Sequence, residues 1–341
     1  MYAAAATETS QSPTLPPARG PLSTAVVEGL RRGALSAPRA AVDDADPFGE
    51  DLTLALQVCY ELHYRGFAGV DPAWEWDPGL LALRREMECS FLAAVRAEVA
   101  EGDDVTGTID ALLVEPVHGT GVTHHLRDCG EWWQLREYIA HRSIYHLKEA
   151  DPHAWVIPRL QGQAKASLVA VEYDEFGGGR GEWVHSQLFA DLMRCVGLCD
   201  EYLHYLDDVP APAIAVVNLM SLLGLHRSLR GAMVGHFTAA EITSAPSAAR
   251  MARALERLGV DPECTLYFTE HMEADAVHEQ IMRRDVVADL LDREPKLAAQ
   301  VVFGIQATEL LEDRLAEHLL SCWRASKTSL RRPLADHLDP A

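Results

Sequence analysis

The sequence of 341 residues is poor in positive charge and in long apolar runs. It has 30 Lys and Arg against 51 Asp and Glu, and the resulting net charge of −21 repels nucleic acid and anionic membrane surfaces. No stretch approaches about 18 consecutive apolar residues, and no basic flank followed by an apolar segment opens the chain. We therefore expect a cytoplasmic protein without nucleic-acid or membrane partners.

Cysteine is scarce, and familiar cofactor motifs are missing. The seven cysteines are odd in number and include no Cys-x-x-Cys pair, which excludes a zinc ribbon and predicts reduced thiols. Cys195 and Cys199 have the spacing of one helical face, where small apolar filler is the favoured role. The glycine-rich run at 177–181 lacks the Lys-Ser/Thr of a phosphate loop, and no Gly-x-Ser-x-Gly elbow is present. These absences exclude nucleotide cofactors and serine hydrolysis.

Alternating strand patterns are almost absent, whereas apolar residues recur at helical spacing from Asp51 onward. We expect one all-α domain over residues 47–328 and a C-terminal tail over 329–341. Residues 1–46 are rich in Ala, Thr, Ser and Pro, which predicts a flexible N-terminal tail. The predicted helices lie between 51 and 66, at 78–95, at 131–149, from 158 to 177, and at 182–196, 212–224, 226–243, 246–258, 261–291 and 295–323.

One predicted helix carries a metal-binding pattern. At 100° per residue, His271, Asp275 and His278 project from one helical face within about 60°. Two imidazoles and one carboxylate suit iron or manganese better than structural zinc. The alternative interpretation is a solvated polar face with incidental histidines, and the spacing alone does not separate the two.

A second metal ion would need ligands from neighbouring helices. Glu149, Glu175 and His185 are the candidates, because inward side chains of a helical bundle converge in carboxylate-bridged di-iron centres. Several neighbours compete with them. Glu172, Asp174 and Glu182 are alternatives to Glu175, and Glu137 with His141 is an alternative to Glu149.

The order and spacing of these six residues resemble the heme-oxygenase-like di-iron oxidases and oxygenases, or iron-containing redox enzymes. In that family a Glu on one helix, a Glu and a His about ten residues apart, and a His-x3-Asp-x2-His helix supply the ligands. The resemblance extends over about residues 50–325. It implies a heme-oxygenase-like helical bundle, two ferrous ions, O2 as co-substrate, an external reductant and a homodimer. The implied metal ligands are Glu149, Glu175, His185, His271, Asp275 and His278.

A ferritin-like bundle is the nearest structural rival, because it uses Glu-x-x-His pairs on two helices. Glu182 with His185 and Glu201 with His204 satisfy this pattern. The two pairs are separated by too few residues for two long antiparallel helices, so the resemblance above is preferred.

The members that this chain resembles act on small molecules. N-oxygenation of an amine in an amino-acid-like substrate is the leading hypothesis. Oxidative C–C cleavage or desaturation of an amino acid or fatty acid is the alternative, and a non-catalytic acidic helical binding protein is a further one. Four basic residues are candidates for binding an anionic substrate group, or else simply balance surface charge: Arg142, Lys165, Arg227 and Arg230. Leu188, Phe189, Val277 and Ile281 are expected to line the cavity.

Overall fold

A computed structural model describes residues 12–35, 40–114 and 119–334, and these are helical with no strand among them. The all-α fold class is thereby confirmed. The chain divides into two compact units, Met1–Glu88 and Cys89–Ala341. Composition predicted a single domain over 47–328, because no linker-like sequence marks the boundary between these two units.

The first unit contains a helix where a flexible tail was expected. Helix α1 (Pro21–Arg32) packs against α3 (Glu50–Glu61), and α2 (Ala40–Asp43) lies between them in the chain. The Asp51 carboxylate accepts hydrogen bonds from the backbone N–H groups of Leu22 (2.9 Å) and Ser23 (2.7 Å), which caps the start of α1. The tail prediction is therefore wrong for Pro21–Arg32, and its residues 1–11 and 36–39 lie outside the described part.

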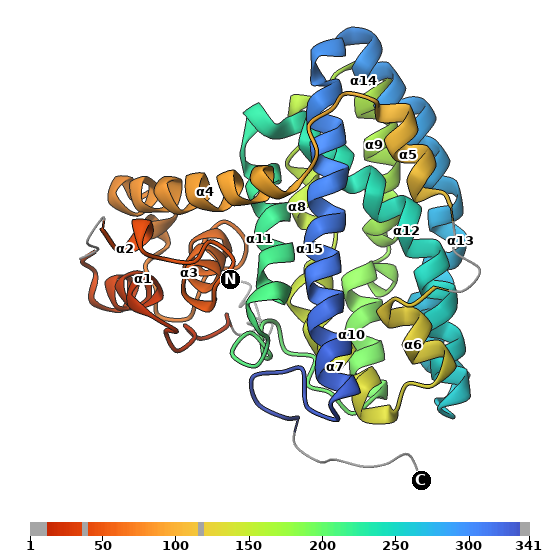
Figure 1. The fold of residues 1–341 in the computed structure, drawn as a ribbon, viewed down its shortest axis with the longest axis horizontal. Helices are drawn as coiled ribbons and strands as arrows, with labels where there is room; N and C mark the ends of the chain where they lie inside the picture. Colours follow the sequence, from red (N-terminus) through yellow and green to blue (C-terminus); the bar gives the residue numbers. More distant parts are fainter. Residues whose placement is uncertain (1–11, 36–39, 115–118, 335–341) are drawn as a thin grey trace, which may run out of the picture. The chain divides into compact units, whose positions relative to one another are not determined.

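The second unit begins within α4 (Pro78–Glu98). Figure 1 shows α15 crossing the middle of this unit beside α11 and α12, and α12 has its most extensive contacts with α15 and α13. The remaining helices of the unit are α5 (Val105–Leu112), α6 (Val122–Asp128), α7 (Trp132–His146), α8 (Asp151–Ala154), α9 (Gly162–Glu175), α10 (His185–Cys195), α11 (Ala211–Leu225), α12 (Arg230–Arg257), α13 (Leu266–Ile281), α14 (Ala288–Arg293) and α15 (Ala298–Arg324).

Two predicted helices and the predicted C-terminal tail differ from expectation. Helix α12 runs through Pro246, where two separate helices were predicted, and so tolerates the loss of one backbone donor. The long helix predicted to 291 is divided by a π-helical segment at Met282–Val287. The C-terminal tail prediction is wrong at its start, because Ser329 is buried and donates a hydrogen bond to Glu137 (2.7 Å); residues 335–341 lie outside the described part.

Helices α12 and α15 cross with their backbones in close approach. A methyl group added to Gly304 would lie 2.0 Å from the carbonyl oxygen of Ala232, and one added to Gly235 would lie 2.1 Å from that of Val301. Only glycine fits at these two positions, because no rearrangement of a side chain can relieve a clash with backbone.

Cys195 and Cys264 form a disulfide with a Cα–Cα distance of 5.8 Å. The prediction of reduced thiols is therefore wrong for these two residues, and Cys195 is exposed rather than buried filler. Cys195 is the last residue of α10, and Cys264 lies in the short turn before α13. The bond thus ties the end of one helix to the beginning of another, across 69 residues of sequence.

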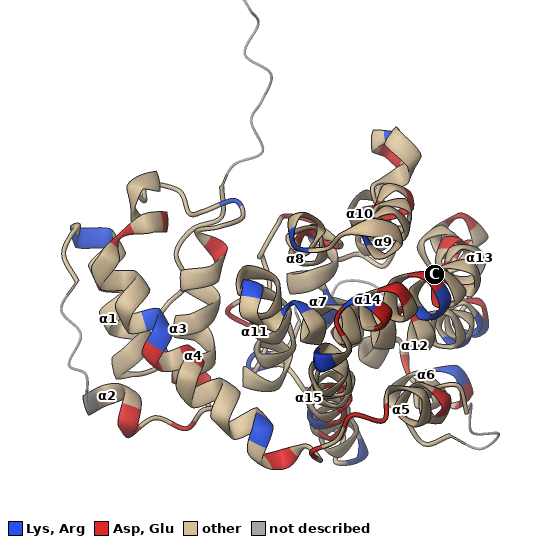
Figure 2. Ribbon diagram, turned by 90° about the horizontal axis from the view of Figure 1, so that it is seen from above, with Lys and Arg blue, Asp and Glu red and all other residues tan. Residues whose placement is uncertain are grey.

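Acidic and basic positions are interspersed along the helices of the second unit (Figure 2). Within the described ranges, no single helix is both long and apolar enough to cross a membrane. One bent pair, Ala211–Leu225 with Arg227–Arg257, satisfies the length and composition test only when its two helices are taken together.

Candidate metal centre

The predicted metal-binding face of α13 points inward. His271, Asp275 and His278 are 6%, 2% and 1% exposed, so the alternative of a solvated polar face is wrong. Met272 and Val277 on the opposite side of the helix are 40% and 58% exposed. The prediction that Val277 lines a cavity therefore fails, because it lies on the outward face.

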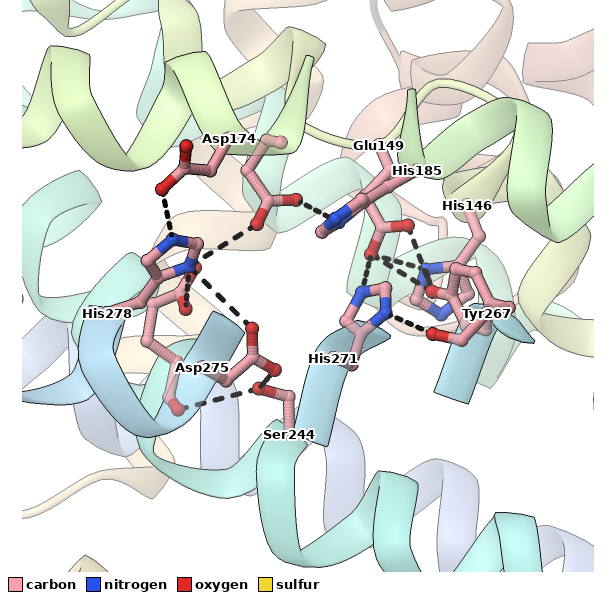
Figure 3. A network of polar contacts seen from close by, with 11 residues as sticks. His146, Glu149, Asp174, His185, Ser244, Tyr267, His271, Asp275 and His278 are labelled. Carbon is pink, nitrogen blue, oxygen red and sulfur yellow. Dashed lines mark hydrogen bonds and ion pairs between the residues drawn. The ribbon is translucent and has the colours of Figure 1, made fainter. Parts of the chain in front are cut away.

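The structure brings all six predicted ligand residues together, in two buried clusters (Figure 3). In the first, ligand-type atoms of Glu149, His185 and His271 lie within 4.8 Å of one another. Asp275 and His278 belong to the second cluster, with Glu175 and one further carboxylate. Glu149 lies in the turn after α7, and the other members come from α9, α10, α12 and α13, so residues distant in sequence converge in the core of the second unit.

Glu175 connects the two clusters. Its Oε2 lies 2.8 Å from Nδ1 of His185, and its Oε1 lies 3.6 Å from Nδ1 of His278. The two oxygens of one buried carboxylate thus face imidazoles of different clusters. This is the arrangement that a carboxylate bridging two metal ions requires.

The further carboxylate is Glu241 on α12, which sequence reasoning missed. Its Oε2 lies 3.2 Å from Nδ1 of His278. Burial raises the pKa of Glu241 to about 8, and the carboxylates of Asp275 and Glu175 add to this against the lowering effect of His278. The available signal was a lone carboxylate within the apolar stretch at 237–242, but no second ligand on α12 marks it as one of a set.

The competing carboxylates have other places. Asp174 is mostly exposed and contacts the outer nitrogen of His278, Nε2, at 3.2 Å, whereas Glu182 is exposed. Glu172 is buried without a hydrogen-bond partner, and burial together with Glu175 and Glu241 raises its pKa to about 9. Glu137 lies outside the two clusters, where it accepts a hydrogen bond from Trp323 (3.0 Å).

Hydrogen bonds orient the first cluster. The ring Nδ1 of His271 lies 2.7 Å from the carbonyl oxygen of Tyr267. Since a carbonyl oxygen can only accept, Nδ1 carries a proton, and Nε2 faces Glu149 at 3.5 Å. The hydroxyl of Tyr267 donates to Glu149 (2.9 Å), and Nδ1 of His146 lies 2.9 Å from the same carboxylate. Such partners of a ligand fix its orientation and increase its basicity.

Four buried polar atoms in these clusters have charged neighbours but make no hydrogen bond of acceptable geometry. They are Nδ1 of His185, Nε2 of His271, Nδ1 of His278 and Oε2 of Glu241. Leaving such atoms unsatisfied costs free energy, and a cation would satisfy all of them. The mixture of imidazole nitrogens and carboxylate oxygens is a donor set suited to iron. The residues present therefore fit an iron centre.

The pKa values reflect an excess of carboxylates. Burial lowers the pKa of His271, but the nearby Glu149 carboxylate raises it to about 10. Burial likewise lowers the pKa of His278, but Glu241 and Glu175 raise it to about 9. In the absence of metal the clusters thus attract protons, which bound cations would displace.

A cavity of about 420 Å³ adjoins the clusters, and the residues that line it include Glu149, Glu175, Glu241, His271 and Asp275. The predicted lining residue Phe189 borders it, whereas Leu188 and Ile281 do not. Of the four predicted substrate-binding residues, only Arg142 borders the cavity. Lys165, Arg227 and Arg230 lie outside it, and Arg230 is paired with Glu294.

A third group of ligand-type residues lies away from the cavity: Cys199, Glu201 and His204. Glu201 and His204 are exposed, and Cys199 is half-buried. Water can hydrogen-bond to the polar atoms of exposed side chains, so this group does not need a metal ion to satisfy them, unlike the two buried clusters.

Comparison with known proteins agrees with this centre. Residues 136–313, just over half of the chain, match the family of iron-containing redox enzymes, and the chain therefore belongs to that family. The matched range holds both buried clusters. The resemblance that the sequence pattern suggested is thus confirmed.

A relative with a named activity is the nitrosourea synthase of Streptomyces achromogenes subsp. streptozoticus. It is 26% identical over 166 residues, which are 48% of this chain and 35% of the relative. The chain thus aligns with about a third of the length of that relative.

Proposed function

We propose that the chain is a non-heme di-iron oxygenase or oxidase that uses O2. The proposed ligands are Glu149, Glu175, His185, His271, Asp275 and His278, joined by Glu241. The observation that carries this proposal is the position of Glu175, one oxygen of which faces each cluster. A single-metal site would not need two separate sets of imidazoles and carboxylates around one shared carboxylate.

Charge also supports two ions. Glu149, Glu175, Glu241 and Asp275 supply four carboxylates, which would balance the four positive charges of two ferrous ions. The side chains of these four residues are buried, and buried charges are stable only when they are paired. When bound, iron supplies the electrons for reduction of dioxygen, while the helices hold the ligands and exclude bulk water.

The proposed reaction is oxygenation of an amine nitrogen in an amino-acid-like substrate. A hydroxylamine product requires R–NH₂ + O₂ + two electrons + two protons → R–NHOH + H₂O, so an external two-electron reductant takes part. The relative's name, nitrosourea synthase, denotes a product with oxidised nitrogen, and this favours nitrogen as the oxidised atom. Oxidative C–C cleavage or desaturation is the second candidate, because the same cavity also borders the apolar side chains of Phe189 and Met220.

The test begins with anaerobic titration of the full chain with ferrous iron. We expect two ions per chain in the wild type, one in His271→Ala and one in His278→Ala, because each variant disrupts a different cluster. Glu175→Gln should weaken both sites. Glu182→Gln and His204→Ala alter exposed residues of the same types and are the matched controls.

Exposure of the loaded protein to O2 with a reductant and a panel of amines, amino acids and fatty acids then identifies the product by mass spectrometry. A mass gain of one oxygen on nitrogen supports N-oxygenation, and shortened or desaturated products support the second candidate. Failure to bind iron, or unchanged iron binding in all three cluster variants, would refute the di-iron proposal and leave a helical binding protein.

A further inference from the structure

An ion pair opens onto the same cavity as the metal centre. Arg142 on α7 donates two hydrogen bonds to Glu312 on α15, from Nη1 to Oε1 (2.7 Å) and from Nη2 to Oε2 (2.6 Å). Both residues border the cavity, and their side chains are 21% and 34% exposed. The pair is thus neither sealed in the core nor free on the outer surface.

This pair keeps unused hydrogen-bonding capacity. A guanidinium has five N–H donors, of which Glu312 takes two, and a carboxylate has about four lone-pair positions. The guanidinium lies 5.3 Å from the centre of the Tyr138 ring, which supports its plane. A ligand that carries both a carboxylate and an ammonium group would complement the two members of the pair at once.

The adjacent wall of the cavity is also polar. His236 contacts Thr308 through Nδ1 (2.7 Å) and His153 through Nε2 (3.2 Å). His153 is 2% exposed, and its Nδ1 has no hydrogen-bond partner. Beside the ion pair there is therefore a second buried polar group with capacity for a ligand.

A ligand that contacts both this polar wall and the metal centre must be long enough to span the distance between them. Arg142 lies four residues, or about 6 Å along the helix axis, before the last residue of α7, and Glu149 follows that residue by three positions. A small amino acid would not span that distance. An extended side chain of several bonds would.

We propose that Arg142 and Glu312 bind the α-carboxylate and the α-ammonium group of an amino acid with a long side chain. The α-ammonium group is then held by Glu312, away from the metal ligands, and the end of the side chain lies at the centre. The assignment of the side chain as the oxidised part depends on the proposed function above, whereas the binding of the amino acid does not.

The test is isothermal titration calorimetry on the full chain, both free of metal and loaded anaerobically with ferrous iron. The probes are L-ornithine, L-lysine, L-arginine and L-methionine, with L-alanine as the short control. The tightest binder is compared with its analogues that lack the α-carboxylate or the α-amine. We expect each analogue to bind at least about tenfold more weakly, because each loses a charged hydrogen bond.

Protein variants provide the second arm. Arg142→Lys and Glu312→Gln should weaken binding of the tightest probe by about tenfold or more. Glu98→Gln is the matched control, because Glu98 accepts two hydrogen bonds of 2.6 Å from Arg314 of the same helix α15 and does not border the cavity. Circular dichroism verifies that the variants fold, and the probe comparison on wild type decides the question if one does not.

Each outcome bears on the proposal. Absence of binding by all four long probes, equal binding by the truncated analogues, or unaffected binding in Glu312→Gln would overturn it. Amino acid binding without oxidation would contradict the proposed function and leave this inference in place. Oxidation of compounds that lack the α-carboxylate and α-amine would contradict this inference and leave the proposed function in place.

Discussion

The hydroxyl of Tyr267 donates a hydrogen bond to the Glu149 carboxylate (2.9 Å) and lies 2.9 Å from Nδ1 of His146. The phenol of Tyr267 thus links Glu149, a proposed metal ligand, to His146, which is not one. Because the carboxylate also contacts His146 directly, these three side chains form a closed triangle behind the first cluster. The triangle fixes the rotamer of Glu149 before a metal ion arrives.

Tyr267→Phe should therefore weaken iron binding at the first cluster by about tenfold or more, which is the usual effect of losing a group that orients a ligand. Ferrous titration measures the affinity. Tyr173→Phe is the matched control, because the exposed Tyr173 hydroxyl donates to the carbonyl of Gly178 (2.6 Å) and not to a proposed ligand. Equal affinities in the two variants would contradict a positioning role for Tyr267.

Glu241→Gln should act in opposite directions on the two forms of the protein. Without metal, the substitution removes one of the three carboxylates that face Nδ1 of His278, so we expect a higher melting temperature. With iron, it removes a ligand, so the stabilisation that iron confers should fall.

Glu137→Gln is the contrasting control for this experiment. Glu137 is equally buried, but its Oε2 accepts hydrogen bonds from Trp323 (3.0 Å) and from the backbone and hydroxyl of Ser329 (2.9 and 2.7 Å). Its substitution should lower the melting temperature and leave iron binding unchanged. A drop for both variants without metal would show that Glu241 is structural. Differential scanning calorimetry with and without iron makes the comparison.

Loss of the Cys195–Cys264 disulfide should destabilise the protein by about 4 kcal/mol, the loop-closure value for its 69-residue separation. Cys264→Ser and treatment with a reductant should have the same effect, and the reductant should add nothing to the variant. Cys129→Ser alters an exposed free thiol and is the control. Chemical denaturation measures the difference, and equal stability of Cys264→Ser and Cys129→Ser would exclude a structural role for the bond.

Acid should destabilise the protein through His141. Burial, with the charges of His318 and Arg142, lowers the pKa of His141 to about 3. Between pH 6.5 and about 3 only the unfolded chain takes up this proton, so stability falls as the pH drops through that window. His141→Gln should reduce the slope by up to about 1.4 kcal/mol per pH unit. The free energy of unfolding as a function of pH tests this, with His204→Gln on the exposed surface as control.

The α12–α15 crossing should not tolerate a methyl group. Gly304→Ala places a Cβ 2.0 Å from the Ala232 carbonyl oxygen, and we expect a loss of about 3 kcal/mol or more from overpacking. Gly181→Ala is the control, because no heavy atom lies within 4 Å of the added carbon. Comparable unfolding free energies for both variants would show that the helices separate without cost.

Helical periodicity predicted which candidate ligands share one helical face, but it did not separate a metal-binding face from a solvated one. The 3.6-residue spacing brought His271, Asp275 and His278 together, and the resemblance to a known family selected Glu149, Glu175 and His185 from the competing candidates on other helices. Glu241 was missed because its partners lie on other helices, and the apolar residues beside it do not by themselves mark it as a ligand. Sequence also offered no means of ranking the four basic candidates for substrate binding. The three-dimensional structure selects Arg142, because it borders the cavity.

The remaining errors also have physical causes. Helix α1 was hidden by its Pro-rich and Ala-rich surroundings, although Leu22, Val26 and Leu30 recur at helical spacing and are buried. The disulfide joins residues 69 positions apart, and neither cysteine belongs to a recognisable spacing motif. Long-range contacts of this kind depend on packing that local patterns do not encode.

Because Gly235 and Gly304 bring two backbones into direct contact, the separation of α12 and α15 does not depend on the size of the side chains that face the cavity. Helix α12 carries Glu241 and α15 carries Glu312, one from each end of the proposed substrate path. Residues along that path can therefore be exchanged without changing the spacing between the helices that carry Glu241 and Glu312. If the proposed function holds, a scaffold of this kind can accept different substrates while the proposed metal centre keeps its geometry.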